Sequence, residues 1–397
     1  MGRLIGCIFL IIGTSIGAGM LALPLATGGM GFLLSSFFIC FVAWLMYQSA
    51  LAMTECSLQF EPQDNIVTMA RALSGRLFYV SAIVCNFLLL YVLQVAYLRV
   101  GSDVLSQVFV SWLPHAAMAI VFPLLLVVFL VFLLIKGVRH IDIWNRIFVI
   151  SMLLGVLVLV VFVLRYFDFQ NIKHIEIRHS LSVLPLLALS FGFHPLIPSL
   201  VAYQNNDSRG VVRALRWGFC LIVSVYLLWQ LALLAAIPYE GVGGLSALAH
   251  APNQIAALEQ MLTQVTGSSW MEVFFSWLGI SALLSSLIGV ALSLRDMVRD
   301  LLVKSSLVRS DKSAGVWAAL VTVLPSYVFY LISGASFVAL LEKAGILVMY
   351  IIIVVPSVLL IKLRRRQGYA AKQLTHLAMP WILIAFSCCL ALIYIFM

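Results

Sequence analysis

Long runs of apolar residues, separated by short polar stretches, recur along the whole chain. The stretches 119–135 and 149–164 are almost entirely apolar. A helix needs about 20 such residues to cross a membrane, whereas a membrane β-strand alternates apolar and polar positions over about ten. The pattern therefore predicts an all-α polytopic membrane protein with eleven spans, at residues 4–27, 31–59, 76–107, 116–135, 146–165, 182–203, 214–238, 270–303, 314–332, 338–361 and 377–397.

Composition supports a membrane protein. The 397 residues are 63% hydrophobic and 10% charged, whereas a soluble domain carries about 25% charged residues. The net charge of +9 does not require a nucleic-acid partner, because basic residues of membrane proteins gather in cytoplasmic loops. The seven cysteines have neither metal-ligand nor CxxC spacing, so we interpret them as small helix-packing residues without a disulfide framework. We predict no cofactor.

The basic residues also predict an orientation. If the N-terminus is cytoplasmic, 19 of the 24 lysines and arginines fall on the cytoplasmic side of the eleven spans. An odd number of spans then places the C-terminus on the opposite side. The longest outer connection, 238–269, has apolar residues at helical spacing, so we expect it to contain a short helix lying on the protein.

The first span contains a sequence that disfavours a continuous helix. Its GTSIGAGMLALP segment places Gly13, Gly17 and Gly19 among small residues, with Pro24 shortly after them. Glycines at this spacing also allow close packing of two helices, so the segment alone leaves two interpretations open. A break here would expose backbone groups, which is costly in lipid unless they line a polar cavity.

The sixth span contains a second such sequence. Its LSFGFHPLIPSL segment places Gly192, Pro195 and Pro198 close together, and each proline removes a backbone donor and crowds the preceding turn. The two interruptions lie five spans apart, so the helices that carry them cross the membrane in opposite directions. This arrangement is typical of transporters built from an inverted repeat of five plus five helices, here with an eleventh helix added.

Four segments also resemble a known family. They are GTSIGAGMLALP, SFGFHPLIPSLVAY, the WNR triplet at 144–146 and LIGVALSLRD in the eighth span. These motifs, in this order, are similar to those of the bacterial aromatic amino acid permeases, especially the tyrosine-specific ones, within the amino acid/polyamine/organocation superfamily. The resemblance covers nearly the whole chain. It implies a LeuT-like fold and ion-driven amino acid import across the bacterial inner membrane.

On this basis we predict three parts of the chain. Residues 1–167 form the first five-helix repeat, residues 168–361 form the second, and residues 362–397 form a basic cytoplasmic loop and the extra helix. The expected partners are an amino acid as the small-molecule substrate, a coupling ion and the lipid bilayer, and no nucleic acid.

The two breaks provide groups for the amino acid backbone. The N–H groups near Gly17, Ala18 and Gly19 would face the carboxylate at the positive end of a half-helix. Carbonyl groups from both breaks would receive the ammonium group; these belong to Gly13, Thr14, Ser190, Phe191 and Gly192. The aromatic ring needs a largely apolar pocket with one or two polar groups. The candidates for this pocket are Phe191, Phe193, Tyr91, Gln94 and Tyr97.

Ionisable residues inside a membrane are candidates for ion coupling. His194 lies at the predicted break, where it is a candidate both for a hydrogen bond to the substrate and for proton coupling. Glu55 lies near the inner end of the second span and is the other candidate for proton coupling. Ser285 and Ser286 in the eighth span are candidates for sodium coordination together with carbonyls of the first span. We favour proton symport; a sodium-coupled transporter of another neutral amino acid is the alternative. An intramembrane enzyme is the alternative from a different class, but the chain lacks HExxH and GxGD patterns.

Overall fold

The computed structural model describes residues 2–61, 64–108, 114–175, 183–241, 243–251, 254–305, 310–334, 337–367 and 374–396, and its regular elements in these ranges are all helical. Part of the predicted loop within 362–397 therefore lies outside the described residues. The long helices are α1 (Gly2–Thr27), α2 (Gly31–Ser57), α4 (Arg76–Val108), α5 (His115–Lys136), α6 (Val138–Val163), α10 (Ser208–Ala236), α13 (Trp270–Lys304) and α14 (Asp311–Ser333).

Shorter helices complete the bundle. They are α3 (Ile66–Leu73), α7 (Phe169–Ile172), α8 (Leu184–Leu189), α9 (Ile197–Tyr203), α11 (Leu245–Ala249), α12 (Gln254–Thr266), α15 (Phe337–Val348), α16 (Val355–Arg366) and α17 (Met379–Phe396). Among the described residues, three 3-10 turns and one π-helix connect some of them: η1 (Gly28–Met30), η2 (Leu164–Tyr166), η3 (His194–Leu196) and the π-helix η4 (Met349–Val354).

The predicted spans coincide with these helices. In the described part of the chain, eight helical segments are long and apolar enough to cross a membrane, and two shorter apolar segments lie at 2–17 and 379–391. The tenth span is continuous through α15, η4 and α16. The all-α polytopic architecture is confirmed. The pairing of the two five-helix repeats and their limits at 167 and 361 stay a prediction.

The fifth span begins earlier than the predicted residue 146. Helix α6 starts at Val138, directly after Gly137, whose φ of 90° ends α5. Its first turns are polar, so a hydropathy pattern does not detect them. They are stabilised by the ion pair of Asp142 with Arg146, whose carboxylate and guanidinium groups approach to 2.6 Å.

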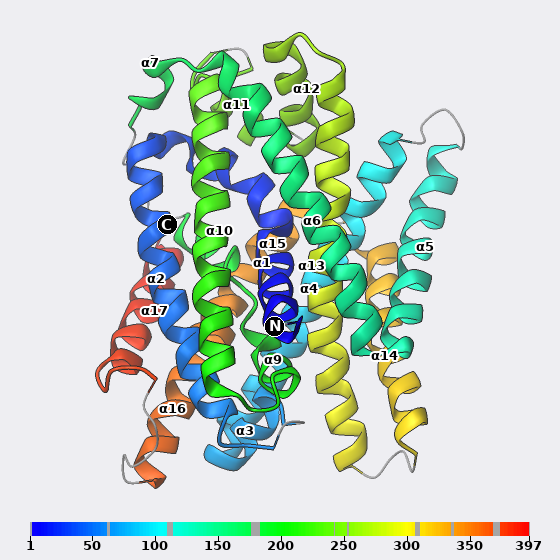
Figure 1. The fold of residues 1–397 in the computed structure, drawn as a ribbon, viewed down its shortest axis with the longest axis vertical. Helices are drawn as coiled ribbons and strands as arrows, with labels where there is room; N and C mark the ends of the chain where they lie inside the picture. Colours follow the sequence, from blue (N-terminus) through cyan, green and yellow to red (C-terminus); the bar gives the residue numbers. More distant parts are fainter. Residues whose placement is uncertain are drawn as a thin grey trace.

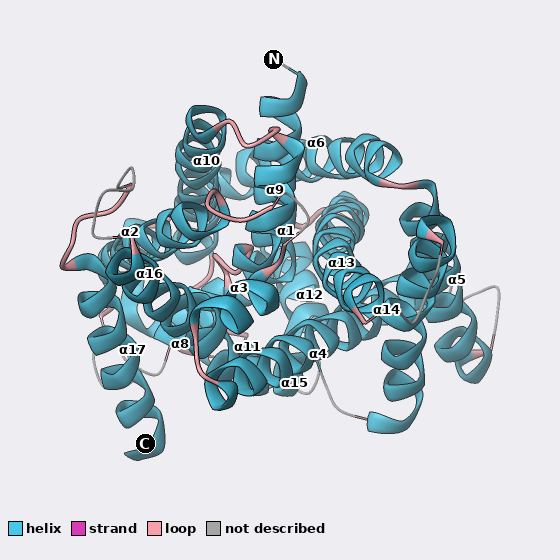
Figure 2. Ribbon diagram, turned by 90° about the horizontal axis from the view of Figure 1, so that it is seen from below, coloured by secondary structure: helices cyan, strands magenta, loops and turns pink. Residues whose placement is uncertain are grey.

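The first helix lies inside the bundle rather than at its edge. Helix α1 packs against α10, α13 and α6 (Figure 2). Helix α17 packs outside, on α16 and α2. Helices α7, α11 and α12 lie together at one end of the molecule and α3 lies at the opposite end (Figure 1); we call these the α12 end and the α3 end.

Helices α11 and α12 confirm the short helix expected in the connection 238–269. Helix α12 packs on α13, where the Ser276 hydroxyl donates to Glu259 Oε1 over 3.2 Å. Burial raises the pKa of the Glu259 carboxyl from its ordinary 4.5 to about 7, opposed by the Ser276 hydroxyl and reinforced by Glu272.

This raised pKa predicts a pH-dependent stability. The folded protein keeps a proton on Glu259 that the unfolded chain releases at lower pH, so stability falls as pH rises from about 4.5 to 7. We expect Glu259→Gln to melt a few degrees above the wild-type protein at pH 8 and close to it at pH 4. Thermal unfolding in detergent at both pH values measures this difference. Equal melting temperatures at pH 8 would contradict it.

Candidate functional site

The first predicted break lies at Gly17. Its φ of 2° and ψ of −134° interrupt helical geometry within α1. A Cβ atom at this position would lie 1.7 Å from Ser286 Oγ on α13, so the close approach of the two helices requires glycine. The N–H groups of Gly17, Ala18 and Gly19 follow at the start of the second half of the helix, as predicted; the Ala18 side chain is outside the described set.

Two buried serine hydroxyl groups contact the segment before this break. Ser286 Oγ donates to the Gly13 carbonyl over 2.7 Å and lies 3.4 Å from the Thr14 carbonyl. Ser285 Oγ lies 2.9 Å from the Ala282 carbonyl and 3.3 Å from the Gly13 carbonyl. Five oxygen atoms, two hydroxyl and three carbonyl, therefore gather where α1 meets α13.

The Thr14 side chain does not face these oxygen atoms directly. Its hydroxyl donates to the Leu10 carbonyl over 2.7 Å, within the same helix. The same Oγ1 atom lies 1.9 Å from the position that a Cβ on Gly289 would occupy. Thr14 thus contributes its carbonyl to the site, while its side chain packs on α13.

The second predicted break lies between α8 and α9. Helix α8 ends at Leu189, and the chain resumes with the 3-10 turn η3 and then α9. Pro195 and Pro198 lie at the starts of these two elements, where a missing N–H costs least. The His194 ring is fully buried, and its Nε2 lies 3.1 Å from the Met46 carbonyl of α2. Since a carbonyl only accepts, Nε2 carries the hydrogen.

One tyrosine connects the two breaks. Tyr226 Oη on α10 lies 2.8 Å from the Ser15 carbonyl in α1 and 2.7 Å from the Ser190 carbonyl after α8. A phenol has one hydrogen, so it serves only one of these acceptors at a time or shares the hydrogen between them. Tyr226 is absent from the sequence-based candidates; the only signal for it is a tyrosine inside an apolar helix, whose hydroxyl must find a partner when buried.

Aromatic rings surround the second break. The Phe191 ring stacks on Phe219 of α10 with centroids 5.8 Å apart and meets Tyr226 edge-on at 5.4 Å. The Phe193 ring contacts Phe219 with centroids 5.5 Å apart, and the Tyr47 ring of α2 also contacts Phe219, at 5.3 Å. Both predicted ring contacts, Phe191 and Phe193, therefore lie in one aromatic cluster with α10.

The three candidates on α4 separate into two groups. Tyr97 is buried, and its hydroxyl interacts with Ser286 next to the first break. Tyr91 donates to the Val321 carbonyl over 2.7 Å, and Gln94 Oε1 accepts from Ser326 Oγ over 2.9 Å. Both of these partners lie on α14, so the structure brings Tyr97 to the break and directs Tyr91 and Gln94 toward α14.

The π-helix η4 adjoins the second break. A Cβ atom on Gly192 would lie 3.4 Å from Ile352 Cδ1 and 2.6 Å from the Leu189 carbonyl. The Ser49 hydroxyl of α2 donates to the Ile352 carbonyl. A π-helix leaves irregular backbone groups that need such partners and frequently marks a functional site. No sequence pattern indicates this element.

Glu55 forms an ion pair within the bundle. Arg364 Nε and Nη2 of α16 each donate to one Glu55 carboxylate oxygen over 2.8 Å. The Leu374 N–H also donates to Glu55 Oε2 over 2.9 Å, and Arg364 Nη2 donates to the Thr375 carbonyl over 2.8 Å. Both charged side chains are almost completely buried, so Glu55 is neutralised by a bidentate partner.

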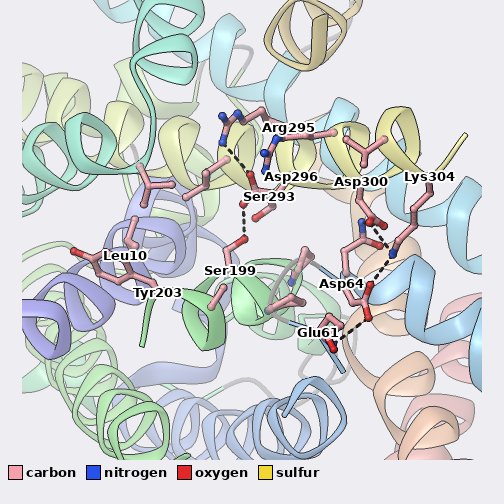
Figure 3. A pocket seen from close by; sticks show the side chains of 18 of the residues that line it. Leu10, Glu61, Asp64, Ser199, Tyr203, Ser293, Arg295, Asp296, Asp300 and Lys304 are labelled. Atoms are coloured by element: carbon pink, nitrogen blue, oxygen red, sulfur yellow. Dashed lines mark hydrogen bonds and ion pairs between the residues drawn. The ribbon is translucent and has the colours of Figure 1, made fainter. Parts of the chain in front are cut away.

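A cavity of about 690 Å³ lies between α1, α9 and α13, and its lining includes residues of the α2–α3 connection at the α3 end (Figure 3). Leu10 lines it one turn before Gly13, so the cavity approaches the first break. Across it, Ser199 Oγ donates to an Asp296 oxygen over 2.7 Å (Figure 3). Near its edge, Lys304 Nζ approaches Asp64 to 2.6 Å. None of these residues is among the candidates predicted from the sequence.

Comparison with known proteins identifies the family. A sequence profile described as the tryptophan/tyrosine permease family matches residues 1–395. The chain belongs to this family. This confirms the resemblance found in the four sequence motifs, and it shows a transporter rather than an enzyme, so the intramembrane enzyme alternative is excluded.

Individual relatives are similar along most of their length. Tyrosine-specific transport system 1 of Haemophilus influenzae is 28% identical over 92% of this chain and 89% of its own. The tryptophan-specific transport protein of the same organism is 28% identical over 90% and 86%. Glutamine transporter 2 of Aliivibrio fischeri is 24% identical over 94% and 93%. The relatives thus differ in their named substrates.

A solved structure shows the same fold. Mhp1, a nucleobase-cation-symport-1 family transporter in a closed conformation with bromovinylhydantoin bound, superposes with a TM-score of 0.66. The match covers 92% of this chain and 79% of Mhp1 at 14% sequence identity. The predicted LeuT-like transporter architecture is confirmed at the level of the fold, and the chain is a multi-pass membrane protein.

Proposed function

We propose that this permease imports aromatic amino acids, with tyrosine preferred, by proton symport and alternating access. The observation that carries the proposal is the Tyr226 hydroxyl, which lies within hydrogen-bond distance of carbonyl groups from both helix breaks. Two interrupted helices whose free backbone groups meet inside a bundle are the arrangement in which such transporters bind substrate. Family membership makes an amino acid the natural ligand for it.

The substrate backbone is assigned to the two breaks. The N–H groups of Gly17, Ala18 and Gly19 receive the carboxylate, because they lie at the positive end of the second half of α1. The ammonium group donates to carbonyls at the breaks, from the segment around Gly13 and Thr14 and from the segment 190–192. The cavity beside Leu10 and Asp296 forms the inner part of the transport path.

The aromatic cluster of Phe191, Phe193 and Phe219 supports a ring-shaped side chain. Stacked and edge-on ring contacts favour another aromatic ring over an aliphatic chain by about 0.5–1.5 kcal/mol for each pair. Competition for bound labelled tyrosine, measured over the twenty amino acids, tests the substrate class. We expect tyrosine, phenylalanine and tryptophan to compete best; stronger competition by leucine, serine or glutamine would overturn the substrate assignment and leave the transporter assignment intact.

Proton coupling is assigned first to His194. Its buried ring at η3 contacts α2, so a change in its charge would disturb the contact between these two elements. Glu55 is the second candidate, although its carboxylate is already paired with Arg364. Uptake by proteoliposomes under an imposed pH gradient without sodium supports proton symport.

The five oxygen atoms between α1 and α13 favour a second candidate, sodium symport. Hydroxyl and carbonyl oxygens are hard ligands suited to an alkali cation, and Ser285, Ser286, Gly13, Thr14 and Ala282 supply them. Uptake that requires inward sodium and ignores the pH gradient would select this candidate. Substitution of Ser286 by alanine should then raise the sodium concentration needed for half-maximal uptake.

We further propose that the protein lies in the bacterial inner membrane with its N-terminus cytoplasmic and its C-terminus periplasmic. The 19 to 5 distribution of basic residues supports this orientation. The α3 end would then face the cytoplasm and the α12 end the periplasm. Residues 1–167 and 168–361 would form the two inverted repeats.

Tyr226→Phe tests the bridge between the breaks. The variant keeps the ring packed on Phe191 but removes the hydroxyl that lies between the Ser15 and Ser190 carbonyls. We expect the affinity for tyrosine to fall about tenfold, which corresponds to the net free energy of one hydrogen bond. Tyr91→Phe is the matched control, because its hydroxyl bonds to α14. A larger loss in Tyr91→Phe than in Tyr226→Phe would place the substrate nearer α14 and contradict this site.

A further inference from the structure

A second pocket lies at the start of α10, and its lining shares no residue with the cavity between α1, α9 and α13. Its volume is about 320 Å³, and its lining is Ser208, Arg209, Val212, Arg213, Arg216 and Leu374. The three arginines are spaced four and three residues apart on a helix, so their side chains share one face. Leu374, from the segment before α17, forms the opposite wall.

Within the described part of the chain, no ion pair neutralises the positive charge of this pocket. In the described residues, none of the guanidinium groups of Arg209, Arg213 and Arg216 takes part in an ion pair, and all three side chains are exposed. The nearby Asp207 carboxylate instead caps the helix, accepting from the Arg209 backbone N–H over 3.0 Å. Three cations within about 10 Å of helix length repel one another, so the pocket is complementary to an anion.

The same helix face continues into the apolar belt of the protein. Trp217, Leu221 and Leu228 follow the arginines on α10 with 55%, 40% and 49% of their surface exposed. Tryptophan is enriched where a membrane helix passes the headgroup level, and leucine faces the acyl chains beyond it. In a helix that crosses a membrane, this order places the arginines toward the lipid phosphates and the exposed apolar residues toward the acyl chains.

We propose that this pocket binds the headgroup of an anionic phospholipid. Arg209, Arg213 and Arg216 hold the phosphate, and the Trp217 and Leu221 surface receives the chain. A free phosphate ion would use only the first of these two surfaces, which is why a lipid is the better occupant. The site is separate from the transport path and does not depend on the identity of the transported amino acid.

Lipid binding here would stabilise the segment before α17 against the start of α10. Leu374, which walls the pocket, donates its N–H to Glu55 Oε2 over 2.9 Å. Glu55 in turn holds Arg364 of α16. A ligand that holds Leu374 against α10 therefore also stabilises the segment that donates to this ion pair. Because a ligand that binds only the folded protein raises its melting temperature, thermal unfolding measures lipid binding.

The test follows thermal unfolding of the full-length protein in neutral detergent. Phosphatidylglycerol, phosphatidylcholine or inorganic phosphate is added at increasing concentration. We expect phosphatidylglycerol alone to raise the melting temperature. The half-saturating lipid concentration should increase about fivefold for each arginine replaced by glutamine, and about a hundredfold in the triple variant Arg209→Gln, Arg213→Gln, Arg216→Gln. The matched control replaces three exposed basic residues of the same predicted side, Arg71, Arg76 and Lys136, and should respond like the wild-type protein.

Three results would overturn the proposal: an equal response to phosphatidylcholine, a shift reproduced by inorganic phosphate at the same concentration, or an unchanged response in the triple variant. If the triple variant does not fold, Arg213→Gln is examined by native mass spectrometry. It should retain fewer phosphatidylglycerol molecules than Arg71→Gln, and equal retention would also overturn the site. None of these results depends on transport activity.

Discussion

Gly17→Ala should reduce tyrosine binding at least about 100-fold while the protein still inserts and folds. The new Cβ atom would lie 1.7 Å from Ser286 Oγ, far inside van der Waals contact, so α1 and α13 must separate at the break. A displacement of about 1 Å in the groups that position a substrate can cost about 100-fold. Gly17→Val, and Gly192→Val at the second break, should abolish binding, because a Cβ on Gly192 would lie 2.6 Å from a backbone carbonyl.

The matched control for these variants is Gly279→Ala in α13. A Cβ atom there meets only Val104, at 3.9 Å, so binding and stability should remain near those of the wild-type protein. Binding of labelled tyrosine to purified protein, alongside the yield of monodisperse material, separates loss of the site from loss of the fold. Near-normal binding in both Gly17→Val and Gly192→Val would show that the breaks serve only helix packing.

Glu55→Gln should destabilise the protein by about 3–5 kcal/mol, because it leaves the Arg364 guanidinium buried without a negative partner. Thermal unfolding in detergent measures the loss. Arg365→Gln, at the exposed neighbour of Arg364, is the control and should be nearly neutral. The double variant Glu55→Gln, Arg364→Gln should recover part of the stability, since no uncompensated charge then remains buried.

The same variant distinguishes the two roles considered for Glu55. If Glu55 is chiefly a structural partner of Arg364, Glu55→Gln loses stability and tyrosine binding together. If Glu55 couples transport to protons, the variant melts normally, exchanges tyrosine across the membrane and loses only the response to a pH gradient. The second outcome would contradict the structural role assigned by the ion pair.

The amino-acid sequence predicts most of the fold because the features that determine the helices and their breaks are local in the chain. Spans follow from runs of apolar residues, and the two breaks follow from Gly17 and from Pro195 and Pro198, residue types that disfavour a regular helix wherever they occur. Helix α10 begins at Ser208, before the predicted residue 214, and α6 departs most, beginning at Val138 rather than at residue 146. There the Asp142–Arg146 pair satisfies polar turns that a hydropathy pattern cannot assign to a helix.

The partners of polar side chains depend on packing between distant segments and could not be predicted. Tyr226 is 211 residues from Ser15, whose carbonyl it contacts, and Glu55 is 309 residues from Arg364. Tyr91 and Tyr97 lie six residues apart on α4, about 120° apart around the helix, so one hydroxyl meets α14 and the other meets Ser286. The π-helix η4 likewise depends on its neighbours, including the Ser49 hydroxyl that bonds to it.

The most direct test of the central claim is counterflow of labelled tyrosine into proteoliposomes that contain purified protein and are loaded with unlabelled tyrosine. The account predicts transient accumulation of label, abolished by external phenylalanine or tryptophan and absent with Gly17→Val. Counterflow exchanges substrate without an ion gradient across the membrane, so its outcome does not depend on whether protons or sodium drive uptake. Failure of the folded wild-type protein to accumulate label, or accumulation only with a non-aromatic amino acid, would contradict the account.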